Sequence, residues 1–188
     1  MPKNDYVLSI DCDWVGSPSQ YQDLLSYFTE KVKDVEEVYF SGDHQFHYPN
    51  IPSNTILVNI DHHHDMGYKD FQYKNMEKGL MDEASWVLAL IRLKKIKGYI
   101  WISNYESEFD GALEDNLAKV RQLDIFKRYF DIKDISEIKY NKILVCESYD
   151  WSKPGKYVYY SLIALAKEMN KKVIFVDNVP NTKGLLQA

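Results

Sequence analysis

Six short β-branched and aliphatic runs, separated by amphipathic stretches, constrain the fold of this chain more than any other feature. The runs occupy residues 6–11, 37–41, 55–61, 98–103, 142–147 and 172–177. Most of them are continuously apolar, which is typical of strands buried on both faces. When such strands alternate with helices, they form a mostly parallel sheet with helices on both sides. The sequence therefore predicts an α/β protein, a three-layer α/β/α sandwich.

The stretches between these runs carry helix signals. In residues 17–32, Ser17 can cap a helix that has Pro18 at its first position, and apolar side chains recur at helical spacing. Residues 82–95 and 156–170 show the same periodicity. The charged segment 111–140 is the least regular part, and we expect one or two short helices and a loop there.

Length and composition favour a single domain over residues 1–188. No apolar run approaches the roughly 20 residues of a membrane-spanning helix, and the N-terminus lacks the sections of a signal peptide. The net charge is −5 with scattered basic residues, and the two cysteines lack CxxC spacing. We expect a cytoplasmic protein that acts on a small molecule or peptide, without nucleic-acid or membrane partners. The oligomeric state stays open.

Polar residues that follow the predicted strands give the strongest functional signal. The carboxyl ends of parallel strands meet at one edge of the sheet, where sites form. All five histidines lie between positions 44 and 64. Side-chain alternation along an extended backbone places Asp61, His63 and Asp65 on one side. The same argument puts Asp11 and Asp13 on one side of the first strand. It directs the side chains between these residues, those of Cys12, His62 and His64, elsewhere. The side chains expected to converge are Asp11, Asp13, His44, Asp61, His63 and Asp65.

Carboxylates and imidazoles gathered in this way require a cation, because buried like charges are costly unless they are neutralised. The set is rich in oxygen, contains imidazole and lacks thiolate, so it suits manganese or another hard divalent ion better than structural zinc. Zinc stays an alternative. Four aspartates exceed the needs of one ion, so we expect two ions, which share carboxylates at a separation of about 3.5–4 Å in such sites.

These motifs resemble those of the arginase/deacetylase superfamily, the ureohydrolases. Asp61-x-His63-x-Asp65 is similar to its Asp-x-His-x-Asp motif, Gly42-Asp43-His44 to its Gly-Asp-His, and Asp11-x-Asp13 to its Asp-x-Asp pair. The stretches NIDHHHD, ASWVLAL and WISNYES further resemble the small arginase-like families that include peptide arginases. Two features depart from the pattern: Asp-x-Asp comes first, which requires a permuted strand order, and the chain is shorter than a typical arginase.

The resemblance implies a binuclear manganese hydrolase. In it, Asp11 and Asp61 would bridge the ions. His44 and Asp65 would complete one coordination shell, and His63 and Asp13 the other. A hydroxide bridging the two ions would attack the carbon of a C–N bond. The favoured target is the guanidino group of an arginine-like substrate, including arginine within a peptide.

A cationic, planar substrate needs carboxylate partners, and glutamates follow two of the predicted strands. We favour Glu147, which ends the run 142–147, as the substrate-binding and catalytic carboxylate. Asn104 and Glu106 are further candidates for substrate binding, and Glu108 is a weaker one. Histidines that are not ligands could pass a proton to the leaving amine or hold a ligand carboxylate in place. These candidates are His62 and His64, with His47 as a third.

Two other interpretations remain open. Asp61-His62-His63 matches the signature of DHH phosphoesterases, manganese enzymes whose Asp-x-Asp motif also comes early. However, the histidine expected just before that motif is missing, no second domain is evident, and no cluster of Arg and Lys is present to hold phosphate. The third interpretation is a metal-binding domain without catalysis, in which the cation contributes to folding.

Overall fold

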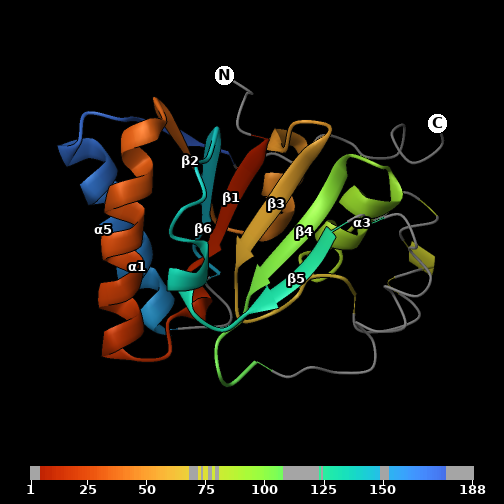
Figure 1. Cartoon of the computed structure of the whole chain (residues 1–188), viewed down its shortest axis with the longest axis horizontal. Helices are drawn as coiled ribbons and strands as arrows, with labels where there is room; N and C mark the ends of the chain where they lie inside the picture. Colours follow the sequence, from red (N-terminus) through yellow and green to blue (C-terminus); the bar gives the residue numbers. More distant parts are fainter. Residues whose placement is uncertain are drawn as a thin grey trace.

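A parallel sheet runs through the computed structural model, which describes residues 5–67, 81–107, 125–148 and 153–176 and positions 72, 74, 75, 78 and 123. Seven parallel strands follow the order β5-β4-β3-β1-β6-β2-β7 (Figure 1). They are β1 (Tyr6–Asp11), β2 (Glu37–Ser41), β3 (Thr55–Ile60), β4 (Ile96–Ile102), β5 (Ile125–Tyr129), β6 (Lys142–Cys146) and β7 (Lys172–Phe175). The described helices are α1 (Pro18–Lys31), α3 (Trp86–Arg92) and α5 (Lys153–Glu168), with the short 3-10 turns η1 (Cys12–Trp14), η2 (Val32–Asp34), η3 (His44–Asn50) and η4 (Ile132–Ile135).

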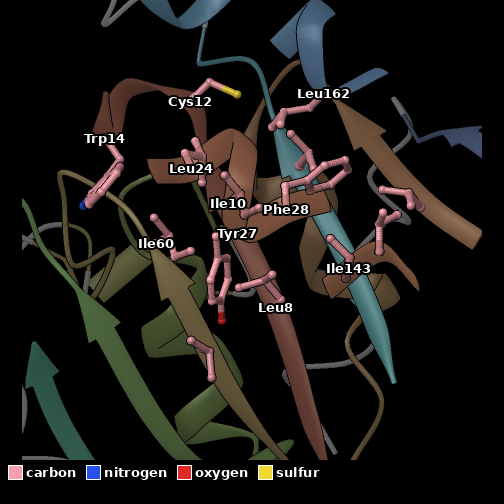
Figure 2. Close-up of a cluster of buried hydrophobic side chains, with 14 of the residues drawn as sticks. Leu8, Ile10, Cys12, Trp14, Leu24, Tyr27, Phe28, Ile60, Ile143 and Leu162 are labelled. Carbon is pink, nitrogen blue, oxygen red and sulfur yellow. The ribbon is translucent and has the colours of Figure 1, made fainter. Parts of the chain in front are cut away.

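The two faces of the sheet bury separate hydrophobic cores. Leu8 and Ile10 of β1 pack with side chains of α1 and α5, which Figure 2 shows around Leu24, Phe28 and Leu162. The intervening β1 residues point the other way, as alternation along a strand requires. There, the second core contains side chains of β1, β3, β4 and β6 together with α3. The predicted α/β fold with a parallel sheet is confirmed, and helices cover both faces (Figure 1).

One strand was not expected. The prediction of short helices and a loop over 111–140 is wrong for residues 125–129, which form β5 at an edge of the sheet. The sequence IFKRY mixes charge with apolar residues because an edge strand has one neighbour, and its side chains are only partly buried. Residues 132–135 do form a 3-10 turn, while residues 108–122 lie outside the described part of the chain.

The expected helices are present with shifted ends. Ser17 Oγ accepts a hydrogen bond from the Gln20 backbone at 3.3 Å, with Pro18 at the first position, so the predicted cap of α1 is confirmed. The helix expected over 82–95 spans only Trp86–Arg92, and its residues 86–91 are all buried, so it has no solvent-facing side over that stretch. Within the described ranges, every helix is too short or too polar to cross a bilayer.

The strand order brings the three sequence motifs together. β1 lies beside β3, and β6 separates β1 from β2. The chain therefore leaves β1 towards one side of the sheet to form β2 and returns to the other side to form β3. Such a change of direction opens a crevice at the carboxyl ends of the strands, which is where α/β sheets bind ligands. The early position of Asp11-x-Asp13 in the chain does not separate it in space from the other two motifs.

Candidate metal centre

Asp11 and Asp61 occupy matching positions on neighbouring strands. Ile10 of β1 lies opposite Ile60 of β3, so the next residue of each strand reaches the same edge. Asp11 Oδ1 accepts a hydrogen bond from the backbone N–H of Asp13 at 2.9 Å, and Asp61 Oδ1 accepts one from that of His63 at 2.8 Å. These Asx turns bend both chains out of the sheet at the same level.

The turns correct our argument from strand alternation. β1 ends at Asp11 and β3 ends at Ile60, so Asp13, His63 and Asp65 all lie beyond their strands. Asp65 has a left-handed backbone with φ of 52°. The predicted residues nevertheless converge, because the turns direct Asp13 and His63 back towards the aspartates that close them.

His44 sits among three carboxylates. Its Nδ1 lies 2.9 Å from Asp65 Oδ2, 3.2 Å from Asp11 Oδ2 and 3.4 Å from Asp61 Oδ2. All four side chains are buried. One imidazole nitrogen carries at most one proton, so it can donate to only one of these oxygens. A divalent cation would satisfy the carboxylates that remain.

A second group of ligand atoms shares Asp61. His63 Nδ1 lies 3.1 Å from Asp13 Oδ2, and the other Asp13 oxygen accepts from the His62 backbone at 3.3 Å. Ligand atoms of Asp13, Asp61 and His63 lie within 4.8 Å of one another, as do those of His44, Asp61 and Asp65. The His63 side chain is 33% exposed, so the second group is the one that reaches solvent.

A thiol adjoins the first group, and the sequence argument did not anticipate it. Cys146 lies opposite Asp11 in the β1–β6 register. Its Sγ comes within 4.8 Å of ligand atoms of Asp11 and His44. In the sequence, the only signal for this thiol was its position near the end of the predicted strand 142–147. Burial raises the pKa of the Cys146 thiol, so the free protein holds it neutral.

Burial sets the protonation of the site. It raises the pKa of Asp11 to about 7, with a further contribution from the charge of Asp13. Burial and the charges of Asp65, Asp11 and Asp13 also raise the pKa of Asp61. Burial alone would lower the pKa of His44, but the neighbouring carboxylates raise it to about 9. Without a cation, protons therefore neutralise part of the negative charge of these carboxylates.

Neutral donors hold the carboxylates in place. Trp86 Nε1 donates to Asp65 Oδ2 at 2.6 Å, Asn59 Nδ2 donates to Asp61 Oδ2 at 2.9 Å, and Ser148 donates to Asp11. Such outer partners orient the ligands of metal sites. None of the three was predicted from sequence as part of the site, because each pairing joins residues whose proximity depends on the fold.

The other predicted histidines lie around the centre without joining either group that contains Asp61. His62 Nδ1 lies 3.0 Å from Asn104 Oδ1. His64 is buried edge-on against Trp101, and its Nδ1 accepts from the Met66 backbone at 3.0 Å. A proton shuttle at His64 is therefore not supported by its position. His47 is buried with Nδ1 3.0 Å from Ser9 Oγ, and burial lowers its pKa.

The predicted substrate residues have different surroundings. The Asn104 amide is buried, donates to the Trp14 carbonyl at 3.2 Å and accepts from the Glu106 backbone at 2.9 Å, so it organises its loop. Glu106 is exposed, and Glu108 lies outside the described residues. Glu147 follows β6 and is partly buried. Burial raises the pKa of the Cys12 thiol, and the charge of Glu147 adds to that rise after those of Asp11 and Asp13.

Helix α5 begins tightly against the centre. A Cβ atom placed on Gly155 would lie 3.1 Å from the Glu147 carbonyl oxygen and 3.4 Å from the Cys12 carbonyl. Contacts this short leave almost no room for a side chain. The first turn of α5 thus holds the segments that follow β1 and β6.

Comparison of the chain with protein families, curated proteins and solved structures finds no match. Functional inference therefore rests on the side chains at this edge of the sheet.

Metal affinity should rise with pH. In the metal-free folded protein, Asp11 keeps its proton up to a pKa of about 7, against an ordinary 3.8, and His44 up to about 9. Because cations bind the deprotonated ligands, binding must release these protons. We expect manganese affinity to increase by roughly tenfold per pH unit, for each proton released, between pH 6 and 8. Titration calorimetry in buffers of different ionisation enthalpy measures the released protons, and a flat pH profile would contradict this assignment.

His63→Ala and His62→Ala form a matched pair. His63 belongs to a ligand group with Asp13 and Asp61, whereas the ring of His62 contacts Asn104. We expect His63→Ala to lose at least half of the bound metal, measured by elemental analysis after desalting, and His62→Ala to keep it. Equal losses in the two variants would show that the ligand groups are wrongly assigned.

Proposed function

We propose that the protein is a hydrolase that uses two divalent metal ions to cleave a C–N bond in a guanidino group. Manganese is the first candidate for these ions. One observation carries this proposal. Asp61 belongs both to the group with His44 and Asp65 and to the group with Asp13 and His63. A carboxylate shared by two ligand groups is the arrangement that a pair of ions requires.

Most of the donor set fits such ions. It offers carboxylate oxygens and imidazole nitrogens, which suit manganese, and its buried carboxylates outnumber the protons of His44. The thiol of Cys146 also lies beside Asp11 and His44, and burial raises its pKa and keeps it neutral. Asp11 and Asp61 would lie between the ions, as the arginase-like resemblance implies. Two ions bound there would supply a water activated for attack on a trigonal carbon. The partly exposed His63 lies where a substrate could approach.

The histidine run favours this function over the phosphoesterase alternative. That alternative rests on the match of Asp61-His62-His63 to the family signature, but His62 turns its Nδ1 to Asn104 and belongs to no ligand group among the described residues. Its partly exposed imidazole is instead available to hold or move a proton beside the centre.

Glu147 supplies the carboxylate that a guanidinium needs. It follows β6, which lies between β1, the strand that ends in Asp11, and β2, the strand that precedes the turn with His44, so it belongs to the same edge of the sheet. A carboxylate facing a guanidinium makes two charge-assisted hydrogen bonds at once. The arginase-like assignment of the fold is part of this proposal.

The product released from a substrate panel tests the function. Protein loaded with manganese is incubated with guanidino compounds, acylated amines and phosphoesters, and urea, carboxylate and phosphate are measured. We expect urea from an arginine-like substrate and none after the metal is stripped. Phosphate release instead would favour the DHH-type alternative, and no release from any of them would leave a metal-binding domain.

Glu147→Gln separates substrate recognition from metal binding. The change removes the charge while keeping the shape, so we expect unchanged metal content and a loss of kcat/KM on the order of 2–4 kcal/mol, which is about 30-fold to 1,000-fold. Glu168→Gln, at the exposed C-terminal end of α5, is the matched control. Normal hydrolysis by Glu147→Gln would remove Glu147 from the substrate site.

A further inference from the structure

A cavity adjoins the metal centre without belonging to either ligand group. It has a volume of about 280 Å³ and lies between the start of α1 and the loops that follow β4 and β5. Its wall includes Trp14 and Asn104. Trp14 directly follows the predicted ligand Asp13, and Asn104 contacts the His62 ring at 3.0 Å. A ligand in the cavity would therefore lie next to the centre.

The charged residues that the structure describes in the cavity wall are all acidic. Asp23, Glu106 and Asp131 contribute three carboxylates from three different segments, and none of the described lining residues is Lys, Arg or His. A cleft lined by one sign of charge concentrates ions of the opposite sign. This lining favours a cation and disfavours a phosphate.

An exposed aromatic pair forms one side of the cavity. Tyr105 is 82% exposed and Phe130 is 45% exposed, and their rings stack with centroids 6.0 Å apart and planes 11° apart. Aromatic faces attract ammonium and guanidinium groups. The guanidinium of Arg128 already contacts Phe130 at 4.7 Å, but it donates to Ser103 and Ser107 and does not line the cavity.

A buried donor also needs a partner there. Trp14 is 3% exposed, and its Nε1 has no hydrogen-bond partner within the described part of the chain. Figure 2 shows that this nitrogen points away from the labelled core side chains. A buried N–H without an acceptor is costly, so a carbonyl oxygen that reached this nitrogen would recover the missing hydrogen bond.

We propose that this cavity binds a basic side chain, with an adjoining backbone carbonyl, of a peptide whose neighbouring arginine reaches the metal centre. A basic peptide supplies the cation for the carboxylates and aromatic rings and the carbonyl for Trp14, whereas a simple polyamine lacks the carbonyl. The volume is just below the range of small-molecule pockets and suits one side chain. This inference rests on the proposed function for the fate of the arginine.

Binding of three peptides tests the cavity. Acetyl-Lys-Arg-Lys-amide, acetyl-Gly-Arg-Gly-amide and acetyl-Glu-Arg-Glu-amide are titrated calorimetrically into the full-length protein, with and without manganese. We expect the lysine peptide to bind at least tenfold more tightly than the glycine peptide in both forms, and the glutamate peptide to bind most weakly. Equal affinities for the three peptides would overturn the proposal.

Paired variants exclude a general effect of protein charge. Glu106→Gln combined with Asp131→Asn should reduce the preference for the lysine peptide to under threefold, and the amide of Asn can still cap η4, as Asp131 does. Glu36→Gln combined with Glu137→Gln removes two exposed carboxylates that do not line the cavity and should leave the preference intact. An equal loss of preference in both double variants would overturn the proposal.

Tyr105→Ala and urea release complete the test. Tyr105 is so exposed that its removal should not affect folding, and we expect the lysine preference to fall at least threefold. An unchanged preference would overturn the aromatic part of the site.

If the lysine preference is present while no peptide yields urea, the cavity stands and the proposed function fails. If urea forms at equal rates from all three peptides without a binding preference, the proposed function stands and the cavity proposal fails.

Discussion

Three aspartate carboxylates buried side by side at the end of the sheet are the constraint on which the centre depends. Asp11, Asp61 and Asp65 surround one imidazole nitrogen of His44. Removing charge from water is costly, so each carboxylate has to be protonated, hydrogen-bonded or neutralised by a cation. The donors around the centre come from α3, β3 and the segment after β6. Much of the nearby fold is thus organised around groups that, left alone, would destabilise it.

The parallel sheet and the residues of the centre could be predicted, but the way in which they meet could not. The apolar runs that contain Ile10 and Ile60 identified two buried strands, and the polar residues after them identified the edge. Alternation was nevertheless the wrong reason, because the Asx turns of Asp11 and Asp61 decide where Asp13 and His63 point. Whether an aspartate closes such a turn depends on where its strand ends, and sequence patterns locate strand ends poorly.

Long-range pairings were beyond prediction for a different reason. Trp86 looked like an ordinary apolar position in a helix, yet its indole nitrogen donates to Asp65. Phe130 and Trp14 line one cavity although more than a hundred residues separate them. β5, which leads to Phe130, has a weak sequence signal because an edge strand is only half covered. A single sequence shows which residues are apolar or charged, while the fold decides which of them become neighbours.

The close approach at Gly155 makes the candidate metal centre sensitive to a residue outside its ligand groups. A Cβ atom at that position would lie 3.1 Å from the Glu147 carbonyl oxygen, so a side chain there would shift α5 or its neighbours. Evolution could therefore adjust the spacing between Asp11 and the segment after β6 by changing the start of a helix more than a hundred positions away in the chain. A larger residue at position 155 would force α5 away from the segments that follow β1 and β6. It would alter the chemistry of the site while leaving every candidate ligand in the sequence unchanged.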